Sequence, residues 1–326
     1  MAEVPSNLKQ FQRLIQQEIF VFPTRQELQA CWELCRLSRN LGFWVSWLPV
    51  AWSIAMVYHA QPGISASAAL SRAGLYIPLC FGLKSLVMTI DDILDADIDE
   101  KVPRTRNRAL PRKAISRVRA WLFFFLQVVI GVYSALTILR PATLRVSMMV
   151  WPMYIIYPTC KRWTYFAPVM LGLMLKIGAL MGWIDLTMDN QIPWVTLIAL
   201  YFGACLWTIV YETIYQYQDK AEDIALGLYS MAILFGKMTI PICVMATFGF
   251  MGSFYFAGVS NGQGYAFYIG ITCAGGLQLA RLLKTDIEKP GDCEKVFRGT
   301  PLIGQIILGG LVIDAVLQRV VNGIPL

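Results

Sequence analysis

Two groups of carboxylates follow long apolar stretches of this sequence and suggest a metal site. The first lies in the run D-D-I-L-D-A-D-I-D over residues 91–99. Within it, Asp92, Asp95 and Asp99 stand at i, i+3 and i+7, so on a helix they share one face and can bind a divalent cation. The second group, later in the chain, contains Asp219, Glu222 and Asp223. Two acidic groups at the ends of apolar segments predict a metal-bridged site for a polyanion.

Basic residues follow the first acidic group at once. They are Lys101, Arg104, Arg106, Arg108 and Arg112. Carboxylates alone would repel an anion, whereas carboxylates together with Mg2+ and guanidinium groups can bind a diphosphate. The alternative is a solvated loop whose charges neutralise one another, which is the usual meaning of mixed charge. Because the acidic pattern recurs beside a second apolar segment, the diphosphate site is favoured.

The composition indicates a membrane protein. Of the 326 residues, 56% are hydrophobic and 15% are charged, and the mean hydropathy is +0.53. A soluble domain of this size would be far less apolar. Inside hydrocarbon the backbone groups must be satisfied internally, so the spanning segments must be helices. The chain is therefore predicted to be an all-α integral membrane protein.

Nine segments are long and apolar enough to cross a bilayer, at about 20 residues per crossing. They cover residues 43–60, 66–90, 117–139, 142–160, 165–186, 192–214, 232–257, 265–284 and 301–321. Together they predict one domain, residues 41–326, built as a nine-helix transmembrane bundle. Residues 1–40 are a more polar extension without the pattern of a cleaved signal peptide. Its amphipathic stretch, expected on the membrane surface, contains Leu8, Phe11, Leu14 and Ile15.

Lysine and arginine are concentrated in alternate connections. The loop 91–116 and the segments around 161, 220 and 281–298 are basic, whereas 60–65, 186–191 and 258–264 contain neither residue. Positive charge marks the cytoplasmic side, so both acidic groups are expected to face the cytosol. The net charge of +7 then reflects sidedness and an anionic ligand. Nucleic acid is not an expected partner, because no basic face with interleaved aromatics is present.

Histidine and cysteine chemistry is excluded. The single histidine, His59, lies in the first predicted span, and the eight cysteines are scattered. A zinc site or a histidine-based triad therefore has no residues to build it. His59 is interpreted as a packed or helix-end side chain.

The two acidic groups and the basic loop resemble the motifs of the UbiA-type intramembrane prenyltransferases. That family carries N-D-x-x-D-x-x-x-D, then R-T-x-x-R-P-L, and later D-x-x-x-D. Here the corresponding residues are 91–99, R-T-R-N-R-A-L at 104–110, and 219–223. Further matches are R-L-S-R-N-L-G-F-W at 36–44, Tyr157-Pro158 with Lys161-Arg162, and G-A-L-M-G-W at 178–183. The set looks most like the eukaryotic secondary-metabolism branch of the family.

The resemblance implies a nine-helix bundle around a cytosol-facing polar cavity. In such proteins two Asp-rich motifs hold Mg2+ on an isoprenoid diphosphate, and the prenyl tail lies in a tunnel within the lipid. Loss of the diphosphate gives an allylic cation, which a dry aromatic-lined cavity protects from water. The expected partners are an isoprenoid diphosphate, an aromatic acceptor and membrane lipid, in an endoplasmic-reticulum-type membrane.

The resemblance also assigns residues. The expected metal ligands are Asp91, Asp92, Asp95, Asp99, Asp219 and Asp223, of which Asp92, Asp95, Asp219 and Asp223 form the catalytic set. The residues expected on the diphosphate are Lys84, Arg104, Arg108, Lys161, Arg162, Lys176 and Lys220. Lys161 and Arg162 are equally explained as positive-inside anchors. Glu212 is expected to point into the cavity.

Several positions depart from the family pattern. Asp91 replaces the leading Asn and creates D-D-x-x-D, the motif of soluble prenyl-chain synthases and class I terpene cyclases. Lys176 stands where the family usually has Asn, and Ala225 and Tyr229 stand where lysines are common. A buried ammonium is costly in a membrane, so Lys176 is expected to pair with the diphosphate or with an acidic-motif residue. Lys176 and Lys220 would then replace the missing positive charge.

Three functions remain open on these grounds. The first is transfer of the prenyl group to an aromatic or other lipophilic acceptor in terpenoid biosynthesis. The second is a terpene cyclase, in which an alkene of the same chain captures the cation. The third is transport of an anionic lipid, because intramembrane charges also line substrate pathways. Transport is disfavoured by the lack of inverted-repeat symmetry and by charges at one face rather than at the midplane.

Overall fold

The computed structural model describes residues 21–38, 40–187 and 191–326. In these ranges every regular element is an α-helix or a short 3-10 helix, and none is a strand. The all-α prediction is therefore confirmed. The amphipathic stretch expected around Leu8 to Ile15 lies outside the described residues.

The chain divides into two compact units, described separately below. Of the described residues, unit 1 contains 21–38 and 82–132, and unit 2 contains 40–81, 133–187 and 191–326. Helices α4 (Ala66–Leu94) and α6 (Arg117–Ile138) each contribute residues to both units.

In unit 1, helix α2 (Arg25–Leu34) is tied at both ends by charged residues. Thr24 and Glu27 form a capping box, and the Glu27 carboxylate also accepts a hydrogen bond from Arg119 at 2.6 Å. Hydrogen bonds from Thr24, together with the charge of Arg119, lower the pKa of Glu27. Near the other end, Glu33 pairs with Arg112 at 2.8 Å. These contacts fix the helix that delivers Arg36, two residues after its end.

The core of unit 1 joins α2, the end of α4, the loop after α5 (Ala96–Asp99) and the start of α6. Its buried members are Ala30, Leu34, Ile90, Ile93, Ala96, Ala109, Leu110, Ala114, Ile115, Ala120 and Phe124. Because apolar residues from the loop 100–116 lie in this core, the loop is a packed segment rather than a solvated one.

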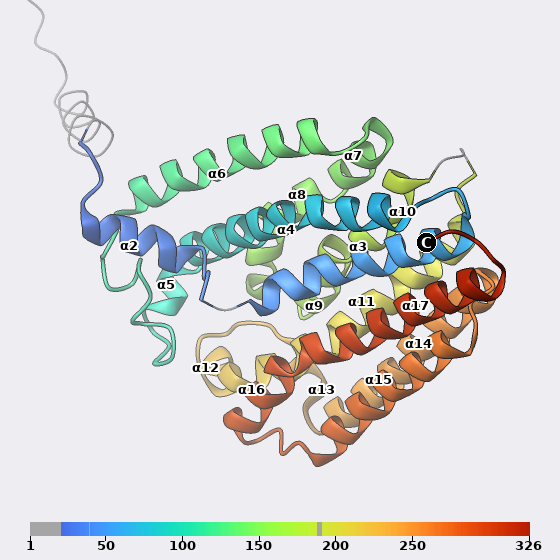
Figure 1. The fold of residues 1–326 in the computed structure, drawn as a ribbon. Helices are drawn as coiled ribbons and strands as arrows, with labels where there is room; N and C mark the ends of the chain where they lie inside the picture. Colours follow the sequence, from blue (N-terminus) through green and yellow to red (C-terminus); the bar gives the residue numbers. More distant parts are fainter. Residues whose placement is uncertain (1–20, 39, 188–190) are drawn as a thin grey trace, which may run out of the picture. The chain divides into compact units, whose positions relative to one another are not determined.

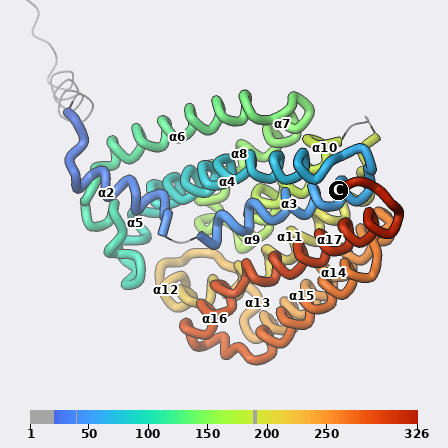
Figure 2. Tube along the Cα trace, viewed as in Figure 1, coloured from blue at the N-terminus to red at the C-terminus, as the bar shows by residue number. Residues whose placement is uncertain are grey.

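Unit 2 contains the remaining helices. They are α3 (Leu41–Ala60), α7 (Pro141–Met148), α8 (Trp151–Ile156), η1 (Tyr157–Arg162), α9 (Ala167–Leu175), α10 (Gly178–Leu186), α11 (Trp194–Gln216), η2 (Tyr217–Asp219), α12 (Lys220–Ala225), α13 (Met231–Phe235), η3 (Gly236–Met238), α14 (Thr239–Ser260), α15 (Tyr265–Lys284), α16 (Pro290–Arg298) and α17 (Thr300–Val321). Helix α11 packs on α14, and α17 packs on both α15 and α3 (Figure 1; the same trace is drawn as a tube in Figure 2).

Helices α3 and α10 approach each other closely at two glycines. A Cβ on Gly178 would lie 2.5 Å from the Val50 side chain, and one on Gly182 would lie 2.5 Å from the Val50 carbonyl oxygen. Small residues four apart allow this approach in membrane helices. Where the backbones are so close, the backbone N–H of Trp183 donates to the Ser53 hydroxyl at 2.8 Å. The G-A-L-M-G-W motif is thus the contact surface of α10 on α3.

Eight segments of the described chain are long and apolar enough to cross a membrane, one fewer than the nine predicted. The difference is the segment 142–160, which consists of α7, α8 and η1 instead of one long helix. Helix α7 ends at Met148, four residues before Pro152. Because proline lacks an N–H and its ring clashes with the carbonyl four residues earlier, the helix stops there.

Candidate active site

The first acidic group is buried at the end of α4. Asp92 lies in the last turn of α4, Asp95 is at the N-cap position of α5 without a side-chain capping bond, and Asp99 is the last residue of α5. The three side chains are only 3–4% exposed. Backbone bonds from Asp95 N to Asp91 O and from Asp99 N to Asp95 O continue the helical path across the break between α4 and α5. Asp91 is the more accessible member of the group, with a side chain 20% exposed.

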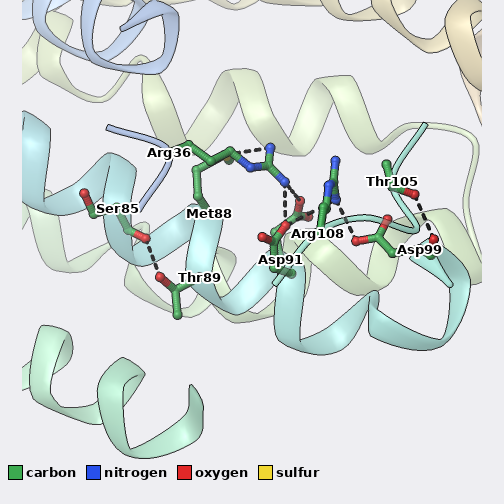
Figure 3. Close-up of polar contacts among 9 residues, drawn as sticks. Arg36, Ser85, Met88, Thr89, Asp91, Asp99, Thr105 and Arg108 are labelled. Carbon is green, nitrogen blue, oxygen red and sulfur yellow. Dashed lines mark hydrogen bonds and ion pairs between the residues drawn. The ribbon is translucent and has the colours of Figure 1, made fainter. Parts of the chain in front are cut away.

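Two arginines meet these carboxylates (Figure 3). Arg108 Nη1 lies 2.7 Å from Asp99 Oδ2 and 3.2 Å from Asp92 Oδ1. Arg36 Nη2 lies 2.5 Å from the same Asp92 oxygen and 3.8 Å from Asp91 Oδ2. Asp92 Oδ1 is therefore shared by two guanidinium groups, each partly accessible to solvent.

Arg36 was not among the predicted site residues, although it opens the motif at 36–44. It has a left-handed backbone conformation with φ +47°, which is uncommon for a residue with a side chain. Lys84 holds this turn, because its ammonium donates to the Arg36 carbonyl at 2.5 Å. Lys84 is 4% exposed and therefore does not snorkel to solvent. In the structure Lys84 therefore stabilises the backbone turn at Arg36.

The loop after α5 positions Arg108. The Thr105 hydroxyl donates to the Asp99 carbonyl at 3.1 Å, and Thr105 is buried. This bond folds the R-T-R-N-R segment back over α5, so that Arg108 reaches Asp92 and Asp99 (Figure 3). Arg104, also expected on the diphosphate, has an exposed side chain on the same loop.

The second acidic group lies where α11 ends. Asp219 closes η2, and Glu222 and Asp223 lie in the first turn of α12, all three half-buried. Lys220 lies 4.5 Å above the centroid of the Tyr217 ring and 3.9 Å from a Glu288 carboxylate oxygen. Lys220 thus pairs with Glu288 in the structure, and its contact with the diphosphate stays a prediction.

Two further predicted basic residues of unit 2 lie in η1. Lys161 and Arg162 form its last turn, and the Lys161 carbonyl accepts from the Tyr229 N–H at 2.8 Å. The Tyr229 ring meets Tyr165 edge to face. Tyr229, which stands where the family commonly has lysine, therefore joins η1 to the segment after α12.

Lys176 makes its hydrogen bonds with a backbone carbonyl and a tyrosine hydroxyl. It is fully buried, its ammonium donates to the Val45 carbonyl at 2.6 Å, and it lies 3.4 Å from the Tyr211 hydroxyl. Within the described residues it forms no ion pair with a carboxylate, so the predicted pairing with an acidic-motif residue is not observed. His59 is buried 3.4 Å from Asp314, as expected of a packed side chain.

The carboxylates of the first acidic group are the candidate ligands for a metal ion. Among the described residues no three His, Cys, Asp or Glu side chains converge closely enough to hold a metal ion. Asp92 and Asp99 instead converge on one cationic nitrogen of Arg108. Two buried carboxylates gathered around a positive charge are the oxygen donors that a hard divalent cation requires. The donor set therefore fits such a cation, provided that Arg108 turns away.

This chain is similar to known proteins of one family. A profile described as the UbiA prenyltransferase family matches residues 46–303. The chain is 32% identical over 295 residues to the mitochondrial 4-hydroxybenzoate polyprenyltransferase of Homo sapiens, a match covering 88% of this chain and 75% of that protein. The mitochondrial relative gives no support to the expected endoplasmic-reticulum-type membrane.

Solved structures share the fold. An apo UbiA homologue from Aeropyrum pernix K1 superposes with a TM-score of 0.66 at 23% identity, covering 83% of this chain and 97% of that one. A UbiA homologue from Archaeoglobus fulgidus, bound to GPP and Mg2+, superposes with a TM-score of 0.61 at 14% identity, covering 88% and 99%. At these identities the likeness concerns the fold.

Proposed function

This chain belongs to the UbiA prenyltransferase family, and we propose that it transfers the prenyl group of an isoprenoid diphosphate to an aromatic acceptor with the help of Mg2+. The observation that supports this most is the buried set of Asp92 and Asp99 around Arg108. Such a set has both the oxygen donors for a cation and the guanidinium donors for a diphosphate.

Mg2+ would be held by Asp92, Asp95 and Asp99, with Asp91 at the accessible edge of the group. When bound, the cation offsets the negative charge that builds up on the departing diphosphate. Asp219 and Asp223 are proposed as the second set of ligands, and their partial exposure leaves them accessible to a ligand.

Arg36 and Arg108 are proposed to bind the diphosphate itself. Each guanidinium now contacts Asp92 and is partly exposed. When the carboxylates turn to a cation, these groups can donate to phosphate oxygens instead, which planar guanidinium does in bidentate fashion. Lys84 would keep Arg36 in its left-handed turn during this exchange. Arg104, exposed on the same loop, is proposed as a further contact.

The acceptor is proposed to be an electron-rich hydroxylated ring. The human relative is named as a 4-hydroxybenzoate polyprenyltransferase, and an allylic cation reacts with such a ring by forming a carbon–carbon bond while the ring loses a proton. The diphosphate leaves with the electrons of the broken C–O bond, so the step needs no oxidant. Membership of a secondary-metabolism branch stays a prediction.

The test is incubation of the purified protein with geranyl, farnesyl or geranylgeranyl diphosphate and Mg2+, with and without 4-hydroxybenzoate. We expect a prenylated aromatic product only when the acceptor is present. A cyclic hydrocarbon formed without acceptor would replace transfer by cyclisation. Absence of turnover with every diphosphate and acceptor tried, by protein that binds them, would support a non-enzymatic role.

Sidedness gives a separate prediction. Asn107 is exposed in the basic loop and therefore suits a cysteine probe, whereas the neighbouring Thr105 is buried. In a cysteine-depleted background, Asn107→Cys and Ser260→Cys should react with an impermeant thiol reagent from opposite faces of sealed vesicles. The reason is that basic connections stay on the cytoplasmic side, and residues 258–264 carry no Lys or Arg. Labelling of both positions from one face would contradict the predicted topology.

A further inference from the structure

Lys176 lies at a break between two helices in the interior of unit 2. It directly follows α9 and lies two residues before α10 begins. Its side chain is 0% exposed, in a segment long and apolar enough to span the membrane. A buried ammonium in such a place is expensive unless its donors are satisfied. The contacts of its Nζ therefore indicate what it does.

The acceptor of the Lys176 hydrogen bond is a carbonyl that α3 cannot satisfy in the regular way. Helix α3 continues through Pro49, which has no N–H. The carbonyl four residues earlier, that of Val45, consequently receives no bond from residue 49. The Lys176 ammonium donates to this carbonyl at 2.6 Å. One donor from outside the helix thus replaces the one that Pro49 removes.

The same ammonium also contacts α11. It lies 4.7 Å from the centroid of Trp207 and 5.5 Å from that of Tyr211, and it is 3.4 Å from the Tyr211 hydroxyl. Aromatic faces stabilise a desolvated cation electrostatically. Lys176 therefore joins α3 to α11, whose chain continues through η2 to Asp219.

The backbone around Lys176 holds it against this part of α3. Gly178, two residues later, approaches so closely that a Cβ there would lie 2.5 Å from Val50 and 3.5 Å from the Ser46 carbonyl. Ser46 lies within the Val45–Pro49 turn, and Val50 directly follows it. The glycine contact and the lysine bond therefore act on the same turn of α3.

We propose that Lys176 is a positioning residue rather than a diphosphate ligand: it supplies the hydrogen bond that Pro49 removes from α3 and thereby fixes α11 at Trp207 and Tyr211. The effect on catalysis rests on the proposed function, because α11 leads to the second acidic group. The effect on stability does not.

The test is a double-mutant cycle of Lys176→Met and Pro49→Ala. Methionine keeps an unbranched apolar side chain and removes the donor, whereas alanine at 49 restores an N–H for the Val45 carbonyl. We expect Lys176→Met to lower the thermal unfolding temperature of the purified protein in detergent, and to lower it clearly less in the Pro49→Ala background. Coupling of this kind measures the shared carbonyl.

The chain offers a matched control in Pro78, which lies inside α4. Pro78→Ala also restores a helical N–H, but Lys176 makes no contact with that turn, so its effect should add to that of Lys176→Met without coupling. Equal coupling with both prolines, or additivity in both cycles, would overturn the assignment of the Val45 carbonyl.

Kinetics separate positioning from ligand binding. We expect Lys176→Met to lower kcat with little change in KM for the diphosphate, and Pro49→Ala to recover part of kcat. A raised KM that Pro49→Ala leaves unchanged would make Lys176 a diphosphate ligand and overturn the proposal. If the wild-type protein showed no turnover, the proposed function would fail, and the unfolding cycle would still decide the role of Lys176.

Discussion

Replacing Asp92 by alanine should reduce prenyl transfer by about a hundredfold or more, the loss typical of removing electrostatic stabilisation of a departing group. Asp92 is 3% exposed, and its Oδ1 is the shared partner of Arg36 and Arg108. Without it a proposed metal ligand is lost, and the two guanidinium groups are no longer held together. Asp219→Ala should have a loss of the same order if the second motif supplies the other ligands.

The measurement is turnover of purified protein with an isoprenoid diphosphate, 4-hydroxybenzoate and Mg2+. Asp97→Ala is the matched control, because Asp97 is an exposed carboxylate within the same acidic run, and it should leave turnover nearly unchanged. EDTA should stop the wild-type reaction, and added Mg2+ should restore it. Retention of more than roughly a tenth of activity by folded Asp92→Ala would refute the proposed metal role.

Much of the first site was predictable, because its chemistry depends on local spacing. Asp92, Asp95 and Asp99 recur at helical intervals after an apolar segment, and the structure gathers all three at the end of α4 and in α5. Their role as metal ligands stays a prediction. The membrane character also followed from composition, since no soluble fold explains so much apolar sequence. The count of nine spans is not confirmed, because the predicted span 142–160 is broken into short helices: hydropathy averages over Pro152 and does not register its missing N–H.

The partners that lie far apart in sequence were not predictable. Arg36 meets Asp92 across 56 residues, and only the left-handed turn after α2 brings it there. Lys176 donates to Val45 across 131 residues. The sequence shows that Pro49 leaves one carbonyl without a helical donor, but it does not show which residue replaces that donor. From its charge alone, Lys176 is therefore predicted to have an anionic partner, whereas the structure gives it a carbonyl.

Asp185 is a buried carboxylate that the sequence reading did not single out, although the structure gives it four donors. It is 0% exposed and pairs with Arg72 through the Nε atom. It also accepts from the Tyr76 hydroxyl at 3.0 Å, from the Thr143 hydroxyl at 3.0 Å and from the Arg140 N–H at 3.1 Å. These bonds join α4, α7 and α10 within unit 2. The bond from the Arg140 N–H also gives a partner to the backbone at the N-cap of α7.

Asp185→Ala should therefore destabilise the protein by about 3–5 kcal/mol, because it leaves the largely buried Arg72 guanidinium without its counter-charge. The measurement is the unfolding free energy, or the thermal midpoint, in detergent. Replacing both partners, with Asp185→Leu and Arg72→Met, should cost less than Asp185→Ala alone, because no uncompensated charge then remains buried. A double variant less stable than Asp185→Ala would contradict the assignment of the loss to the uncompensated charge of Arg72.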